Sequence, residues 1–172
     1  MLNNISPAGW LRGTFLTVVL LITALFHPAL AQNNPLRYIP QPGTPIGIPN
    51  FVQPEQGCSW AGIGGQVFDQ DGQPVSGLIV KVDGEIDGQE ILIYSVSGGN
   101  TQIGPGGYLM KISDAPLASN GRLFLQVVNI DGSKISERIQ LSTVSECNAS
   151  LLLVNIRAIE FLNPIYLPAV GK

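Results

Sequence analysis

From residue 58 onward, apolar and polar residues alternate with a period of two, and turn-forming residues separate the alternating runs. Glycine next to aspartate, asparagine or another glycine marks these turns, because such residues tolerate the positive φ angles that tight turns require. The runs lack the 3.6-residue period of a helix. We therefore expect an all-β sandwich. The predicted strands cover residues 61–68, 77–82, 90–96, 108–112, 122–129, 134–141 and 151–157.

The alternation also assigns side chains to the two faces of each strand. One parity is apolar and should fill the core, whereas the other carries the charged residues. Glu137 is an exception, because it falls on the apolar parity. It either pairs with a buried arginine or lies at a sheet edge, where an inward charge discourages strand addition. The inward rows are Leu78, Val80 and Val82, then Tyr108, Met110 and Ile112, then Ile135, Ile139 and Leu141, while Lys81, Lys111 and Arg138 point outward.

The N-terminus has the three parts of an export signal. Arg12 supplies the positive charge, residues 14–26 form a short uncharged apolar core, and Ala29-Leu30-Ala31 is a small-x-small cleavage site. The alternative is a retained membrane anchor, but the apolar run is short for a span of about 20 residues and is interrupted by His27. We expect residues 1–31 to be a signal peptide. The product would be secreted or held in the cell envelope, without spanning the membrane.

Removal of this signal changes the charge and the candidate chemistry. Arg12 is the only charged residue before residue 32, so the net charge goes from −3 to −4. Such a chain lacks the clustered Lys and Arg that bind a phosphate backbone, and no nucleic-acid partner is expected. The single histidine, His27, would leave with the signal. Because histidine is the commonest general base and transition-metal ligand, we expect a non-catalytic protein without a cofactor.

Residues 32–57 contain six prolines. Proline blocks helices and interior strands and favours an extended, stiff backbone, so this segment is interpreted as a linker. The alternative is a ligand for a proline-binding module, since residues 42–45 match the P-x-x-P spacing. The folded domain is then expected over residues 58–158, followed by an apolar tail over residues 159–172.

Cys58 and Cys147 are the only cysteines and lie just before the first and the last predicted strand. In an exported protein, two cysteines without CxxC spacing favour a structural disulfide. Closing a loop of nearly the whole domain would stabilise it by about 4 to 5 kcal/mol in the chain-entropy model. The alternative, a nucleophilic cysteine, is disfavoured because the exported chain would have no histidine to activate a thiolate.

Residues 65–82 read GQVFDQDGQPVSGLIVKV, in which Asp-x-x-Gly makes a turn, Pro74 starts the return strand and Gly77 lets that strand bend. This run resembles the opening hairpin of the carboxypeptidase regulatory-like domains. Gly107-Tyr108-Leu109-Met110 is similar to the family's later Gly-x-Tyr strand. The resemblance implies a seven-stranded Greek-key sandwich of the transthyretin (prealbumin) kind, related to the Cna-B-like repeats of collagen adhesins.

The same resemblance implies a function. Such domains in exported bacterial proteins are non-catalytic modules for structure, adhesion or protein–protein interaction, so the partner would be another envelope or extracellular protein. A first alternative is a carbohydrate or small-ligand binding module that uses the glycine-rich loop at residues 97–108, with Asn100, Thr101, Gln102 and Tyr108 as contacts. A second alternative is an accessory domain to a separately encoded hydrolase.

Asp83, Glu85 and Asp87 place acids at alternate positions before Gly88, like the beginning of an EF-hand calcium loop. The pattern departs at its twelfth position, where Tyr94 stands in place of a bidentate glutamate. The alternative is an acidic hairpin connection between two strands. We keep the three acids as candidate calcium ligands and expect no other metal site.

The C-terminal tail is apolar and interrupted by two prolines. Tyr166, Leu167 and Pro168 resemble the Tyr-Leu-Pro tails of some exported bacterial proteins. The functional interpretation of this pattern is a docking segment that adds to a partner's sheet or groove, a hypothesis that ranks below the alternative. The alternative is a tail folded back over the outer face of the last strand.

Overall fold

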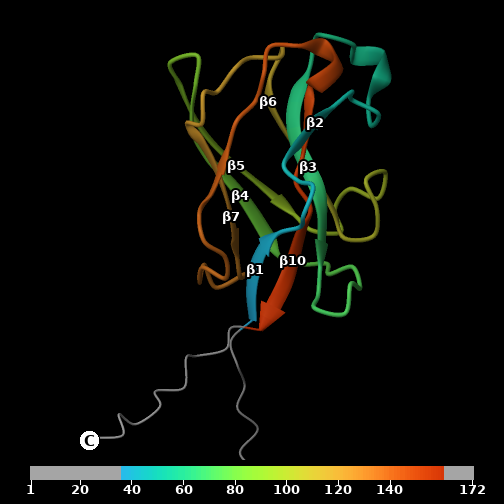
Figure 1. Ribbon diagram of the computed structural model, residues 1–172, viewed down its shortest axis with the longest axis vertical. Helices are drawn as coiled ribbons and strands as arrows, with labels where there is room; N and C mark the ends of the chain where they lie inside the picture. The colour runs from blue at the N-terminus through green and yellow to red at the C-terminus, as the bar shows by residue number, and fades with distance from the viewer. Residues whose placement is uncertain (1–35, 161–172) are drawn as a thin grey trace, which may run out of the picture. The chain divides into compact units, whose positions relative to one another are not determined.

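Two β-sheets pack face to face around one hydrophobic core in the computed structural model, which describes residues 36–160 (Figure 1). This confirms the predicted all-β class. Apart from two short 3-10 turns, η1 (Pro54–Gln56) and η2 (Cys147–Ala149), the regular elements of this part are strands, and none of its helices is long and apolar enough to cross a membrane. The first sheet contains β1 (Leu36–Pro40), β2 (Ile46–Ile48), β3 (Ala61–Phe68), β6 (Gly107–Ser113), β9 (Leu151–Leu153) and β10 (Ile156–Glu160). The second contains β4 (Ile79–Ile86), β5 (Gln89–Val96), β7 (Leu123–Val128) and β8 (Ile139–Leu141).

The first sheet is built around β3. On one side β3 pairs antiparallel with β6, and on the other it pairs parallel with β9 and then, further along, with β10. β9 and β10 therefore act as two halves of one interrupted strand. β2 pairs antiparallel with β9, and β1 pairs antiparallel with β10, so these two short strands form the outer edge.

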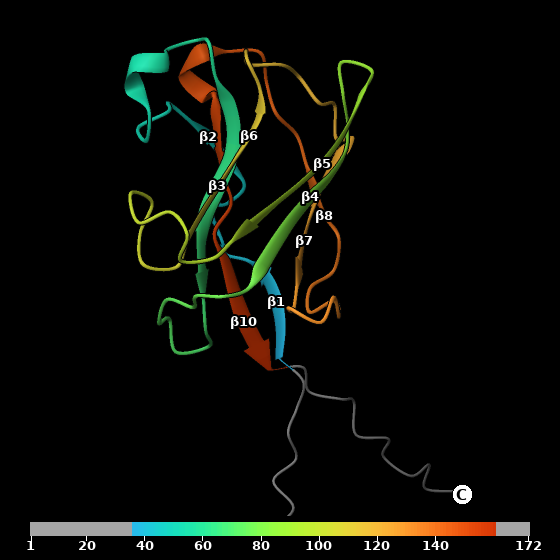
Figure 2. The ribbon, with the colours of Figure 1, turned by 180° about the vertical axis from the view of Figure 1, so that it is seen from behind.

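The second sheet has the order β5-β4-β7-β8 and is antiparallel throughout. β4 and β5 form a hairpin that is joined by a tight turn at Asp87 and Gly88, both with positive φ (Figure 2). A single bridge, Tyr38 to Ser136, connects β1 to the segment that precedes β8. This bridge connects the two sheets on the side of the sandwich where β1 and β8 lie.

Each of the seven predicted strands has a counterpart, and residues 61–68 match β3 without a shift. Two predicted strands are interrupted. The strand expected at 134–141 narrows to β8, because the Ser136 side chain takes the place of a ladder partner and its Oγ accepts the Val127 N–H at 2.8 Å. The strand expected at 151–157 breaks at Asn155, whose Oδ1 accepts the Gln66 N–H at 3.0 Å. Side-chain acceptors of this kind compete with the backbone ladder.

The linker interpretation of the proline-rich segment is wrong for residues 36–57. This segment supplies β1, β2 and η1, so the folded domain begins well before the predicted residue 58. Proline disrupts a strand only where its missing N–H is needed, and an edge strand leaves half of its N–H groups facing away. Within residues 36–160, Pro40 is the one proline inside a strand, and it is the last residue of β1, which lies at the edge. The predicted signal peptide and nearly all of the tail lie outside the described residues.

The core confirms the predicted faces. Val80, Val82, Tyr108 and Leu141 are fully buried, while Lys111 and Arg138 are exposed. A second, smaller cluster packs Trp60 against Val52 and Leu151. Because Val52 comes from the proline-rich segment, that segment contributes to the packing as well as to the sheet edge.

Cys58 and Cys147 form the predicted disulfide, with their Cα atoms 5.1 Å apart. Cys58 lies ahead of β3, and Cys147 begins η2, ahead of β9. These two strands are parallel neighbours, with Gly62 opposite Leu151, so their starting points meet at the same end of the sheet. The bridge therefore joins chain segments that the sheet already holds together.

Candidate functional site

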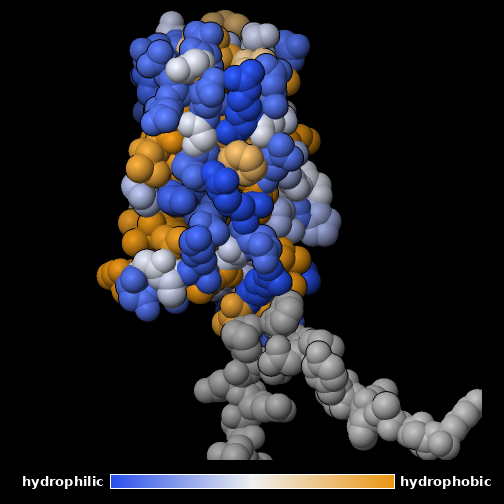
Figure 3. Space-filling model, turned by 90° about the vertical axis from the view of Figure 1, so that its left-hand side faces the viewer, coloured by the Kyte–Doolittle hydropathy of each residue, from blue (hydrophilic) through white to orange (hydrophobic). Residues whose placement is uncertain are grey.

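The outer face of the second sheet collects charged side chains from strands that are far apart in the sequence. Lys81, Asp83 and Glu85 alternate along β4 with residues that face the core. Asp83 lies between Leu92 of β5 and Phe124 of β7. Figure 3 shows this side of the molecule, with hydrophilic groups along its middle and hydrophobic groups toward its margins.

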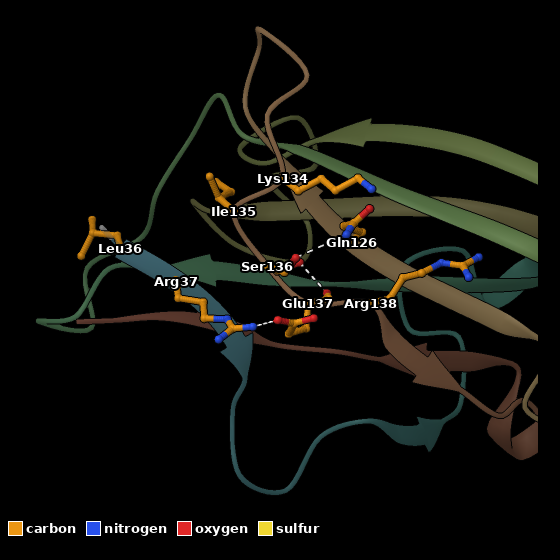
Figure 4. Close-up of a pocket in the computed structure, with 8 residues that line it drawn as sticks. All are labelled: Leu36, Arg37, Gln126, Lys134, Ile135, Ser136, Glu137 and Arg138. Carbon is orange, nitrogen blue, oxygen red and sulfur yellow. Dashed lines mark hydrogen bonds and ion pairs between the residues drawn. The ribbon is translucent and has the colours of Figure 1, made fainter. Parts of the chain in front are cut away.

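Two open depressions lie on this side. The first, here called the outer-face groove, has a volume of about 850 Å³ and involves β4, β5, β7 and the start of β8. The second, here called the seam pocket, has a volume of about 610 Å³ and lies where β1 meets the segment before β8 (Figure 4). Arg138 lines both depressions.

Ion pairs hold the arginines of the outer-face groove in place. Arg138 places Nη2 2.7 Å from Asp83 Oδ2, and its guanidinium carbon lies 4.0 Å from the centre of the Phe124 ring. Arg122 places Nη1 2.6 Å from Glu85 Oε1. Because all four charged groups are partly exposed, each pair contributes well under about 1 kcal/mol to stability. Their main effect is to orient charge on the surface.

The seam pocket shows why a charged residue, Glu137, falls on the apolar parity of its predicted strand. Its carboxylate forms an ion pair with Arg37 of β1 (Figure 4). Tyr38 N donates to Ile135 O at 2.8 Å nearby. Glu137 is 74% exposed, so the predicted pairing with an arginine is found at the surface and not in the core. Lys134 lies on the rim of the same pocket. The pocket thus presents three cations and one carboxylate.

The three candidate calcium ligands are not brought together. Asp83 is held by Arg138, and Glu85 by Arg122. Asp87 lies in the β4–β5 turn with φ 49°. Over residues 36–160, no three acidic, histidine or cysteine side chains are placed to share a metal ion. Asp83 and Glu85 serve instead as the acidic partners of the ion pairs on the outer face.

The glycine-rich loop at residues 97–108 also departs from its proposed role in binding. Tyr108 is fully buried, so it cannot stack on a sugar ring. Asn100 is used inside the loop, where its Oδ1 accepts the Ile103 N–H at 3.2 Å and its backbone N donates to Gly107 O at 3.1 Å. Thr101 and Gln102 remain exposed. The loop closes on itself through these bonds and leaves no aromatic side chain at its surface.

The Tyr108 side chain instead makes a buried hydrogen bond that links the two neighbours of β3 within the first sheet, and this leads to a testable prediction. Its hydroxyl donates to Val154 O at 2.6 Å, and burial raises the pKa of Tyr108 above its usual range. We expect Tyr108→Phe to lower the free energy of unfolding at pH 7 by about 1 to 3 kcal/mol, because the Val154 carbonyl is left unsatisfied. Urea unfolding followed by circular dichroism measures this loss.

The same substitution should alter the response to high pH. Tyr108 stays neutral in the folded chain while the unfolded chain ionises near pH 10, so its contribution is complete below that pH. Above it, the contribution falls by about 1.4 kcal/mol per pH unit. Burial, and secondarily the charge of Asp69, also raises the pKa of Tyr38, but Tyr38 is common to both proteins. Equal slopes above pH 10 for the two proteins would contradict this account.

Sequence reasoning missed the residues that complete the outer face. Arg122, Phe124 and Arg37 were not singled out, and Arg138 was recognised only as outward-facing. The alternating charged residues of β4 were visible in the sequence. The arginines that pair with Glu85 and Asp83, however, lie 37 and 55 residues further along the chain.

No known protein-family model matches the chain, and neither a curated protein nor a solved structure matches it.

Proposed function

We propose that this protein is an exported, non-catalytic β-sandwich module that works by holding or binding another protein of the cell envelope or the extracellular space. The observation that carries the proposal is the pair of depressions that share Arg138 as a lining residue. Both are open to solvent and lined by charged side chains. Small-molecule sites are mostly enclosed and apolar, whereas surfaces that contact proteins are broad and carry oriented charge.

The charges of this surface suit recognition. Arg37, Lys134 and Arg138 surround the seam pocket, while Asp83 and Glu85 lie in the adjoining groove. A partner with an acidic group facing the pocket and a basic group facing the groove would be complementary to it. Complementary charge of this kind sets orientation and the rate of encounter more than it sets affinity. The acidic net charge of the chain makes the cationic pocket a distinct feature of its surface.

Two further observations support the proposal. The Cys58–Cys147 disulfide fits a protein that works in an oxidising compartment, outside the cytosol. The parallel pairing of β3 with β9 and β10, next to an antiparallel β6, is compatible with a Greek-key sandwich of the carboxypeptidase regulatory-like kind. Such a module would be a rigid carrier for the surface described above.

The test is site-specific crosslinking in the producing cell. A photoreactive amino acid replaces Lys134, on the rim of the seam pocket, and in a matched control it replaces Gln73, which is exposed in the β3–β4 turn. We expect one discrete protein adduct from position 134 and none from position 73. Adding Arg138→Ala should reduce that adduct about fivefold or more, the effect of losing about 1 kcal/mol of binding energy.

Three results would contradict the proposal. Equal adducts from both positions would mean random collision, and an adduct insensitive to Arg138→Ala would place the contact elsewhere. Saturable binding to a glycan panel, without any protein adduct, would favour the carbohydrate-binding alternative.

A further inference from the structure

β5 is a long edge strand without the usual protection against pairing with another chain. It has eight residues, pairs only with β4, and contains one charged residue, Glu90, and no proline. Among the other edges of the described sandwich, β2 and β8 have three residues each, and β1 ends in Pro40 and bonds to Ile135 O. The remaining edge strand, β6, has seven residues, pairs only with β3 and carries the exposed Lys111. Short length, proline and charged side chains normally protect an edge strand from pairing with another chain. β5 therefore presents an open template for a further strand.

The backbone alternation shows which residues of β5 face this open edge. Ser97, the next residue after β5, donates its N–H to Leu78 O in the direction of β4. Residues of the opposite parity, Glu90, Leu92, Tyr94 and Val96, direct their N–H and C=O groups away from β4. The Val96 carbonyl already accepts the Gly99 N–H at 3.0 Å. Glu90, Leu92 and Tyr94 are left as the three residues that can pair fully with a new strand.

We propose that the partner of this edge is a second copy of the chain, which adds its own β5 antiparallel about a two-fold axis at Leu92. In this register Leu92 pairs with Leu92 of the other copy, and Glu90 pairs with Tyr94. All three available residues of each β5 are then used, and the two second sheets become one continuous sheet. A shift by one pair in one direction would bring Val96, with its carbonyl occupied, into the ladder. A shift in the other direction would place Tyr94 opposite Gly88, which lies in the β4–β5 turn. The open backbone groups thus select one register that is complementary to itself.

The side chains agree with this register. Leu92 and Tyr94 are 62% and 57% exposed and lie on the same face of β5, so pairing would cover apolar surface on both copies. Within one copy, Glu90 lies directly opposite Glu85, an unfavourable like-charge pair. In the pair, Glu90 would face the hydroxyl of the other copy's Tyr94, whose neighbour on β4 is Lys81. Association would therefore bring Glu90 close to a hydrogen-bond donor, the Tyr94 hydroxyl, and to the positive charge of Lys81.

The contact is small. One added strand buries less than the roughly 1,200 Å² typical of stable complexes, so we expect weak, concentration-dependent dimers. This inference goes beyond the proposed function. Glu90 and Leu92 also line the outer-face groove, whereas the seam pocket, where the crosslinking position Lys134 lies, is lined by other residues. The two experiments can therefore fail separately.

Disulfide trapping tests both the dimer and its register. Two Leu92→Cys chains would bring their Cα atoms to about 5.5 Å, within the range that a disulfide spans. Tyr94→Cys, at a similarly exposed position on the same strand, would leave its two copies about 15 Å apart. Under mild oxidation of residues 32–172, we expect covalent dimer from Leu92→Cys at least tenfold faster than from Tyr94→Cys. Equal rates, or faster linking through Tyr94→Cys, would overturn the proposed register and the contact with it.

The chain without new cysteines provides an independent measurement. Sedimentation equilibrium should show a reversible dimer as the concentration rises between about 10 µM and 1 mM, the range of weak association. Amide exchange at Glu90, Leu92 and Tyr94 should slow in parallel. Leu92→Lys should abolish both effects, whereas Ile130→Lys, at a 91% exposed apolar position away from β5, should leave them unchanged. A monomer throughout this range, or a dimer in which these amides exchange as before, would refute the proposal.

Discussion

A chain that begins at residue 50 instead of residue 32 is expected to lose its cooperative fold. The deletion removes β1 and β2, and with them Tyr38, which is buried in the main core. Loss of a buried aromatic side chain alone costs about 3 to 5 kcal/mol. The deletion also uncovers the backbone groups of β9 and β10 that pair with these strands. The combined loss of free energy is comparable with the roughly 5 to 15 kcal/mol that stabilises a typical domain.

Thermal unfolding measured by near-ultraviolet circular dichroism would show this loss, as the absence of a sharp transition. The matched control begins at residue 35, keeps both strands, and should unfold like the chain from residue 32. Trp60 is a convenient reporter, because Trp10, the other tryptophan, precedes residue 32. If the chain from residue 50 unfolded at the same temperature as the control, the proline-rich segment would be a linker after all.

Replacement of both cysteines, Cys58→Ala with Cys147→Ala, is expected to lower the free energy of unfolding by about 4 to 5 kcal/mol. The bridge spans 89 residues, so it greatly restricts the unfolded chain. In the folded chain it joins β3 and β9, which are already neighbours, so its removal should leave the native arrangement intact. The stabilisation therefore acts mainly through the unfolded state.

Urea unfolding of the oxidised protein and of the double variant gives this difference directly. Oxidised protein treated with a reductant should reproduce the variant, which separates the effect of the bond from that of the substituted side chains. A loss below about 1 kcal/mol would show that the unfolded chain is already restricted by other contacts.

The candidate site was accessible to sequence reasoning only in part. Asp83, Glu85 and Asp87 were recognised as an unusual acidic run, but their chemistry was assigned from local spacing. In the fold, Asp83 meets Arg138 and Glu85 meets Arg122, and these pairings depend on how β4, β7 and β8 align. A shift of two residues along any of these strands would pair the acids with different side chains. Local spacing carries no information about that alignment.

Features that depend on neighbouring residues could be predicted from the amino-acid sequence: the β class, the approximate position of each strand from 61 to 157, the faces of their side chains, and a pairing between the only two cysteines. These follow from the two-residue period of a strand and from the turn preferences of glycine, asparagine and aspartate. The tertiary structure alone decided which segments complete the sheets. It turned a proline-rich segment into β1 and β2, joined Arg37 to Glu137, and left β5 as an edge strand paired on one side only. Such outcomes depend on hydrogen bonds between residues that are distant in the chain. Alternative pairings of whole strands compete for these bonds, and the choice among them leaves no periodic signal in the sequence.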